Sequence, residues 1–170
     1  MLPQLFHIGR FSLATYGVLA AVGLLTGLWV IVWCARRQGM DEEKTWNLGV
    51  LAILSAIVGA KLLLIAIDAR YYAAHPGEIF SLGTLQAGGV YEGGLVVGLL
   101  ASYWYIRRNR MAVLATCDVF APGVALGHGI GRLGCFAAGC CFGKPTDLPW
   151  GVTFTNPLAN FINQTPLGIP

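Results

Sequence analysis

The sequence is poor in charge. Its 170 residues are 56% hydrophobic and only 11% charged. A soluble domain usually carries about 25% charged residues, so the composition excludes that class and favours an integral membrane protein. The formal net charge of +3 is too small to indicate nucleic-acid binding. Residues 1–10 lack a basic leader, and no small-x-small cleavage site follows the first apolar run, so we expect no cleavable signal peptide.

Four apolar stretches have lengths close to the about 20 residues that cross a bilayer. They cover residues 11–35, 45–67, 85–106 and 111–130. The sequence therefore predicts an all-α integral membrane protein, with a bundle of about four transmembrane helices over residues 1–130. Residues 131–170 are predicted to form a signature segment and an extracytoplasmic loop. Residues 144–170 hold five of the eight prolines, which predicts a loop with a short strand at 151–155.

Basic side chains gather at two connections between the expected spans. They are Arg36, Arg37, Arg107, Arg108 and Arg110. Clusters of lysine and arginine mark the cytoplasmic side of a membrane protein. The N-terminus, the loop at 68–84 and everything after Gly131 are therefore predicted to face the outside.

Four polar groups fall at similar depth near the outer side, at about 1.5 Å of rise per helical residue. They are Tyr16, Lys61, Glu92 and Arg132. Charged groups inside a bilayer are costly and usually face a protein interior or a wet cavity, so we expect a functional cavity. The alternative is that Lys61 extends to the outer headgroups and Glu92 only pairs with it.

Residues 129–134 read Gly-Ile-Gly-Arg-Leu-Gly and fit the spacing G-x-G-x-x-G. A dinucleotide site needs this motif after a strand, and here it ends an apolar span. Gly131 and Gly134 allow close approach of a ligand to the backbone. Arg132 can either bind a phosphate through its planar guanidinium or anchor the span at the interface. Glycines at four-residue spacing predict helix packing. They are Gly23 with Gly27, Gly94 with Gly98, and Gly123 with Gly127 and Gly131.

Three cysteines, Cys135, Cys140 and Cys141, fall in the expected outer loop. Thiols outside the cytoplasm tend to oxidise, so we expect a disulfide from Cys135 to Cys140 or Cys141, with one thiol left over. Metal binding is the rival, but C-x₄-C-C lacks a second ligand pair at zinc spacing, and we predict no metal or other cofactor. The absence of a C-x-x-C pair counts against a membrane thiol-redox protein, which stays an alternative.

Residues 127–143 resemble the signature of the prolipoprotein diacylglyceryl transferases. They read Gly-His-Gly-Ile-Gly-Arg-Leu-Gly-Cys-Phe-Ala-Ala-Gly-Cys-Cys-Phe-Gly. Residues 5–17, 59–61 and 89–95, and Asp118 with Ala121-Pro122, resemble other family segments in the same order. Glu92 stands where many members have histidine, Lys61 where they have arginine, and Cys135 and Cys140 where many have asparagine and glutamate. Family members continue beyond Pro170 with a His-Pro-x-x-Leu-Tyr element, so the chain resembles their N-terminal portion.

The resemblance implies transfer of a diacylglyceryl group from phosphatidylglycerol to the lipobox cysteine of a preprolipoprotein at the bacterial inner membrane. It implies that Arg132 binds the lipid phosphate with help from Lys61, that Glu92 is the catalytic base, and that Tyr16 bonds the headgroup. Its partners would be phosphatidylglycerol, preprolipoprotein signal peptides and the bilayer. The remaining alternative is a non-catalytic, truncated membrane subunit.

Overall fold

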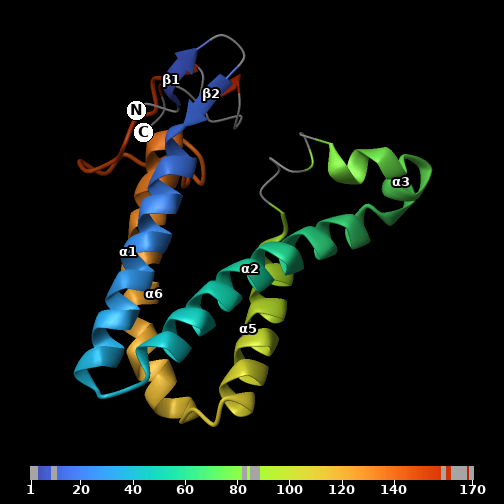
Figure 1. Ribbon diagram of the computed structural model, residues 1–170. Helices are drawn as coiled ribbons and strands as arrows, with labels where there is room; N and C mark the ends of the chain where they lie inside the picture. The colour runs from blue at the N-terminus through green and yellow to red at the C-terminus, as the bar shows by residue number, and fades with distance from the viewer. Residues whose placement is uncertain are drawn as a thin grey trace. The chain divides into compact units, whose positions relative to one another are not determined.

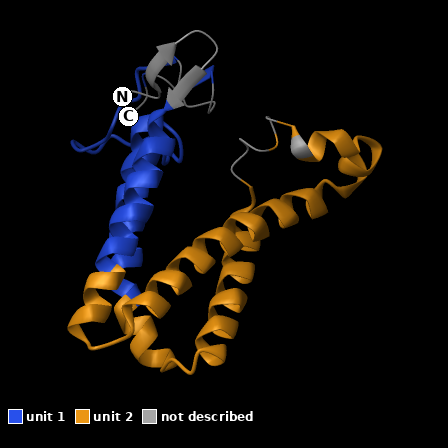
Figure 2. Cartoon of the chain, in the orientation of Figure 1, with its two compact units in different colours: residues 1–30, 120–170 blue, residues 31–119 orange. Residues whose placement is uncertain are grey.

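The computed structural model describes residues 4–8, 11–81, 84, 89–157, 160–161 and 168. Its elements, in chain order, are β1 Gln4–Ile8, β2 Phe11–Ala14, α1 Thr15–Arg37, α2 Glu42–Ile67, α3 Ala69–Ala74, the 3₁₀ helix η1 Pro76–Phe80, α5 Tyr91–Arg108 and α6 Val113–Ala138 (Figure 1). The chain divides into two compact units, unit 1 with residues 1–30 and 120–170, and unit 2 with residues 31–119 (Figure 2). The boundaries fall inside α1 and α6, so both helices contribute to both units.

Helices dominate the described residues, as the sequence predicts for a membrane protein. Within this part of the chain, three helices are long and apolar enough to cross a membrane, namely α1, α2 and α6. The third expected span, residues 85–106, corresponds to the 18-residue α5, which carries Glu92 in its first turn and Arg107 and Arg108 in its last. Its uncharged part is shorter than the about 20 residues that a full span needs.

Unit 1 is built on a close contact between α1 and α6, which lie side by side (Figure 1). A Cβ atom added at Gly23 would lie 2.7 Å from the carbonyl oxygen of Gly127, and one at Gly27 would lie 2.7 Å from that of Gly123. Ordinary contacts between carbon atoms need about 3.5–4.0 Å. The backbones can approach this closely only because the four positions lack side chains, which confirms the packing predicted from their spacing.

Unit 2 contains a second helix pair, α2 and α5. Gly59 and Gly93 face each other, and a Cβ atom on either would overlap the other's carbonyl oxygen. A Cβ atom at Gly94 would lie 2.9 Å from the carbonyl oxygen of Ala56. The backbone N–H of Val90, just before α5, donates to the carbonyl of Ala60 at 3.0 Å. The start of α5 is therefore held against the C-terminal half of α2.

Three helices end in the same way, with a residue in the left-handed region directly after the last turn. These residues are Gly39, Arg110 and Gly139, with φ angles of 65°, 55° and 70°. In each case the N–H of the next residue donates to a carbonyl five positions back, as Met40 does to Ala35, Met111 to Ile106 and Cys140 to Cys135. This is the Schellman motif, which satisfies carbonyls that a helix end otherwise leaves unpaired.

The start of α2 is capped by Asp41, whose carboxylate accepts from the backbone N–H of Lys44 at 3.0 Å. This hydrogen bond lowers the pKa of the Asp41 carboxyl. Leu48, one helical turn further along than Lys44, is 1% exposed and belongs to the core of unit 2, together with Ala35 and Val119. The cap thus begins the helix where its buried face begins.

Two boundaries differ from the sequence prediction. Residues 11–14, expected inside the first span, form β2, which pairs antiparallel with β1 from Gln4↔Ala14 to Ile8↔Phe11. The fourth span does not end at Ile130 but continues as α6 to Ala138, so the expected division at 130–131 falls within a helix. The strand expected at 151–155 is not formed in these described residues, which follow an irregular path.

Candidate active site

A pocket in unit 1 lies between the last turns of α6 and the chain that follows it. Its volume is about 320 Å³. It is lined by Arg132, Cys135, Phe136, Cys140, Cys141, Phe142, Gly143, Lys144, Pro145, Thr146, Val152 and Phe154. The rings of Phe136 and Phe154 meet edge to face, with centroids 6.3 Å apart. The irregular segment after α6 therefore folds back over the helix end and forms one wall of the pocket.

The pocket is cationic. Arg132 and Lys144 both line it, and no acidic side chain is among its lining residues. Arg132 was predicted from the sequence, whereas Lys144 was not, because the lysine lies in a proline-rich segment that is typical of a surface loop. Its position directly after Gly143, at the end of the signature, was the available signal. Two positive groups beside aromatic rings can hold an anionic headgroup attached to an apolar tail.

The three residues of α6 that were predicted to bind substrate, Gly131, Arg132 and Gly134, differ from one another in what surrounds them. Arg132 lies within α6, about 9 Å before its end at the helical rise, rather than beyond the end of the span. A Cβ atom at Gly134 would lie 3.3 Å from the Tyr16 ring on α1, so Gly134 provides the space into which this ring packs. A Cβ atom at Gly131 would have no described neighbour within 4 Å. Packing in the described part of unit 1 explains Gly134, but it does not explain Gly131.

The three cysteines form a cluster at the end of α6. All are free thiols in the structure, and their Sγ atoms lie within 4.8 Å of one another. The Sγ atoms of Cys140 and Cys141 are 3.7 Å apart. Burial raises the pKa of Cys140 to about 12. A hydrogen bond with Cys140, assisted by Arg132, lowers the pKa of Cys141, so Cys141 is the more easily ionised of this adjacent pair. The expected disulfide stays a prediction.

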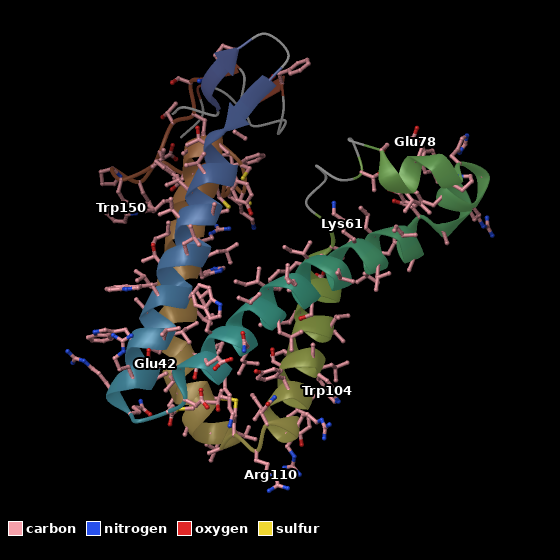
Figure 3. All side chains as sticks on the ribbon, viewed as in Figure 1. Glu42, Lys61, Glu78, Trp104, Arg110 and Trp150 are labelled. Carbon is pink, nitrogen blue, oxygen red and sulfur yellow. The ribbon has the colours of Figure 1, made fainter. Side chains whose placement is uncertain are left out.

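Lys61 and Glu92 lie in unit 2, where α2 meets the start of α5. The ammonium group of Lys61, a residue labelled in Figure 3, donates to the carbonyl oxygen of Thr84 at 2.6 Å. Glu92 lies two residues after Val90, whose N–H is bonded to Ala60. The ion pairs formed between described residues join Arg36 to Glu42 and Lys44 to Asp41, so neither involves Glu92.

The four polar residues proposed to converge are thus divided between the units. Tyr16 and Arg132 belong to unit 1, and Lys61 and Glu92 belong to unit 2. Within each unit the two residues lie near the same end of a helix pair. Their assembly into one cavity stays a prediction from membrane depth.

The three apolar helices and the cationic pocket at a helix end define a multi-pass membrane protein with a site suited to an anionic, partly apolar ligand. Comparisons with known proteins identify the family of membrane proteins to which the chain belongs. A family profile described as prolipoprotein diacylglyceryl transferase matches residues 3–168. The chain belongs to this family.

Curated relatives agree with the family assignment. The chain is 36% identical over 156 residues to the phosphatidylglycerol–prolipoprotein diacylglyceryl transferase of Clostridium tetani, covering 92% of this chain and 61% of the relative. It is 35% identical over 148 residues to the enzyme of that name from Synechococcus elongatus, covering 87% and 50%. It is 32% identical over 149 residues to the enzyme of that name from Finegoldia magna, covering 87% of this chain and 59% of the relative. The chain therefore spans about half to three-fifths of the length of these relatives.

Proposed function

We propose that this chain carries the phosphatidylglycerol-binding part of a prolipoprotein diacylglyceryl transferase. The substrates would be phosphatidylglycerol and the lipobox cysteine of a preprolipoprotein signal peptide. The observation that carries the proposal is the family match over residues 3–168, together with the cationic pocket at the signature. The names of the relatives indicate the reaction, and the pocket offers a binding place for the phosphate group of the lipid.

The reaction is a displacement at carbon. The thiolate of the lipobox cysteine attacks the glyceryl carbon that carries the phosphate ester, so an S–C bond forms and a C–O bond breaks. The leaving oxygen takes the electron pair and departs as glycerol phosphate. Such a step needs a thiolate, because the neutral thiol is a weak nucleophile. It also needs positive donors where negative charge develops on the leaving phosphate.

Arg132 is the residue best suited to the phosphate role. Its guanidinium group can form two parallel hydrogen bonds with phosphate oxygens, and it lines the pocket together with Lys144. The open space at Gly131 leaves the backbone beside Arg132 accessible to a headgroup. The apolar rings at Phe136 and Phe154 provide a surface against which the acyl end of the lipid can lie.

Glu92 and Lys61, both in unit 2, are proposed from the resemblance to take part in the reaction. Glu92 would accept the proton of the attacking thiol, and Lys61 would assist in binding the phosphate. The docking of Val90 on Ala60 supports a shared location for these two residues, because it joins the two helix segments that carry them.

The proposed orientation places the N-terminus and the pocket outside the cytoplasm of a bacterial cell, in its inner membrane. The support lies in unit 2, where basic residues lie at the ends of α1 and α5. Among them are Arg110 (Figure 3) and Arg37, whose guanidinium lies 3.9 Å from the centroid of the Trp33 ring. Clusters of arginine favour the cytoplasmic side, whereas tryptophan is enriched at both interfaces. In intact cells, after mild reduction, a membrane-impermeant thiol reagent should label Cys141. Labelling only after permeabilisation would overturn the orientation.

Transfer of labelled lipid tests the function. Membranes from cells that produce this protein should move a labelled diacylglyceryl group from phosphatidylglycerol to a lipobox peptide, and should leave the matched peptide with serine in place of cysteine unmodified. A membrane thiol-redox protein would instead oxidise or reduce the peptide without adding lipid. Membranes that bind phosphatidylglycerol but transfer nothing would indicate a non-catalytic subunit.

The open space at Gly131 gives a sharper test of the proposed contact between the headgroup and the backbone beside Arg132. Gly131→Leu should reduce transfer strongly, because its side chain would occupy the space beside Arg132, while the melting temperature stays unchanged. Gly129→Leu is the matched control, because a Cβ atom at Gly129 also has no described neighbour within 4 Å. Equal transfer by the two variants would remove Gly131 from the proposed binding site.

A further inference from the structure

The helix end at Gly139 brings two thiols together. In the Schellman motif, the residue after the left-handed position packs against the residue five positions earlier. Here both are cysteines, since Cys140 donates its backbone N–H to Cys135 at 3.0 Å and its Sγ lies 3.5 Å from the same carbonyl oxygen. Cys141 follows with a φ of 58°. This left-handed conformation disfavours residues with a Cβ atom, and it turns the third sulfur toward the other two.

The spacing of the three sulfurs suits coordination to one ion. Zinc–thiolate bonds of about 2.3 Å at tetrahedral angles place neighbouring sulfurs about 3.8 Å apart. The sulfurs of Cys140 and Cys141 are 3.7 Å apart, and all three lie within 4.8 Å of one another. A single disulfide would use only two of them. We propose that Cys135, Cys140 and Cys141 together form a three-thiolate site for a thiophilic metal ion, with Zn²⁺ as its probe.

The surroundings of the cluster support this site. Three thiolates and a divalent ion carry a net charge of −1, and Arg132 and Lys144 line the same pocket. Their positive charges would offset the charge of the complex. Sequence spacing alone argued against zinc, because it counts ligand pairs along the chain. The Schellman motif supplies the missing proximity, since it folds the Cys140-Cys141 pair back onto Cys135.

The fourth coordination position gives the ion a chemical role. Catalytic zinc sites have three protein ligands and an exchangeable fourth position, and here that position would share a pocket of about 320 Å³ with Arg132. A thiol bound to such an ion is deprotonated, so its proton can pass to a weak base such as a carboxylate. The lipobox thiol is the ligand of the right class. This role rests on the proposed transferase function, whereas metal binding does not.

Metal binding is tested on the purified, reduced and metal-free chain in detergent. One equivalent of Co²⁺ should give intense sulfur-to-metal charge-transfer absorption, which Zn²⁺ should displace. Cys135→Ser, Cys140→Ser and Cys141→Ser should each weaken Zn²⁺ binding by more than the about 10- to 100-fold cost of losing an outer-shell partner. Cys34→Ser and Cys117→Ser are the matched controls and should bind normally. No stoichiometric binding, or equal binding by all five variants, would overturn the site.

Alkylation of the wild-type chain tests the metal site even if the cysteine variants fail to fold. Zn²⁺ should protect Cys135, Cys140 and Cys141 from alkylation, as read by peptide mass, and should leave the reactivity of Cys117 unchanged. Protection of fewer than three of these thiols would contradict the site. A disulfide between Cys135 and Cys140 or Cys141 in protein isolated without added oxidant would replace the metal site with the cross-link.

The role of the fourth coordination position is tested by separate experiments. A lipobox peptide should shift the Co²⁺ spectrum toward a fourth sulfur ligand, whereas its serine counterpart should not. Unchanged transfer after complete removal of the metal would refute the role and leave the proposed transferase intact. A spectral shift without any lipid transfer would refute the transferase and leave the metal site intact.

Discussion

Replacing Gly59 by alanine tests the close approach of α2 and α5 on which the position of Glu92 depends. The added Cβ would overlap the carbonyl oxygen of Gly93 and lie 2.5 Å from the Cβ and 2.8 Å from the Cγ2 of Val97. Ordinary contact needs about 3.5–4.0 Å, so the helices must separate by about 1 Å. Overpacking of this kind costs about 1–3 kcal/mol. We expect the upper end, because the opposing oxygen belongs to a helix backbone and cannot turn away.

The assay is reversible unfolding in mixed micelles, with Gly98→Ala as the matched control on the same interface. A Cβ atom at Gly98 would lie 3.4 Å from the Cβ of Ala56, close to ordinary contact, so this variant should unfold within about 0.5 kcal/mol of the parent. Adding Val97→Ala to Gly59→Ala should recover part of the loss, because it removes the side-chain overlap and leaves the backbone overlap. Equal stability of Gly59→Ala and Gly98→Ala would refute the α2–α5 contact.

Three further predictions concern charge and helix ends. Glu92→Gln should abolish transfer and Glu92→His should restore part of it, since imidazole is a competent base near neutral pH. An active, well-folded Glu92→Gln protein would refute the assignment of Glu92 as the base. If Glu92→Gln is inactive and the added Lys61→Met restores transfer, Glu92 only balances the charge of Lys61. The lowered pKa of Asp41 means that its stabilisation is complete above the ordinary carboxyl pKa and is lost as the pH falls through the lowered value. Melting curves at pH 6 and pH 3 should therefore show a smaller acid loss in Asp41→Asn, which still caps the helix, and equal losses would contradict the cap. Arg110→Gly should stabilise the end of α5 by up to about 1 kcal/mol, because glycine adopts the 55° φ without strain. Arg110→Ala should bring no gain in the same unfolding assay, and a matching gain would count against backbone strain as the cause.

The helices and their glycine contacts were largely predictable from the sequence. Absence of charge over a membrane's thickness leaves few alternatives to a span, and the spacing of Gly23 with Gly27 and of Gly123 with Gly127 matches the contact that they form. The end of α6 was predicted too early, because the apolar stretch stops just before the charged Arg132. Of the glycines from Gly123 to Gly139, only Gly139 has a positive φ, and a φ angle is not visible in composition.

The hairpin and the pocket wall were missed for a related reason. Residues 11–14 are as free of charge as the span that follows, so hydropathy joins β2 to α1. Lys144 reaches the pocket because an irregular segment folds back onto the end of α6, and no periodicity marks such a path. The cysteine cluster likewise depends on a turn and not on spacing. Local rules predict the elements here, whereas contacts made by irregular chain decide the site.

Turnover by Arg132 variants tests the central claim most directly, that the signature pocket binds the lipid phosphate during transfer. With labelled phosphatidylglycerol and a lipobox peptide, Arg132→Ala should reduce transfer by at least about 100-fold, as expected for a donor to developing charge. Arg132→Lys should recover little, because lysine cannot form the bidentate contact. Near-normal turnover in either variant, with folding intact, would contradict the account and leave Arg132 as an anchor of α6 at the interface.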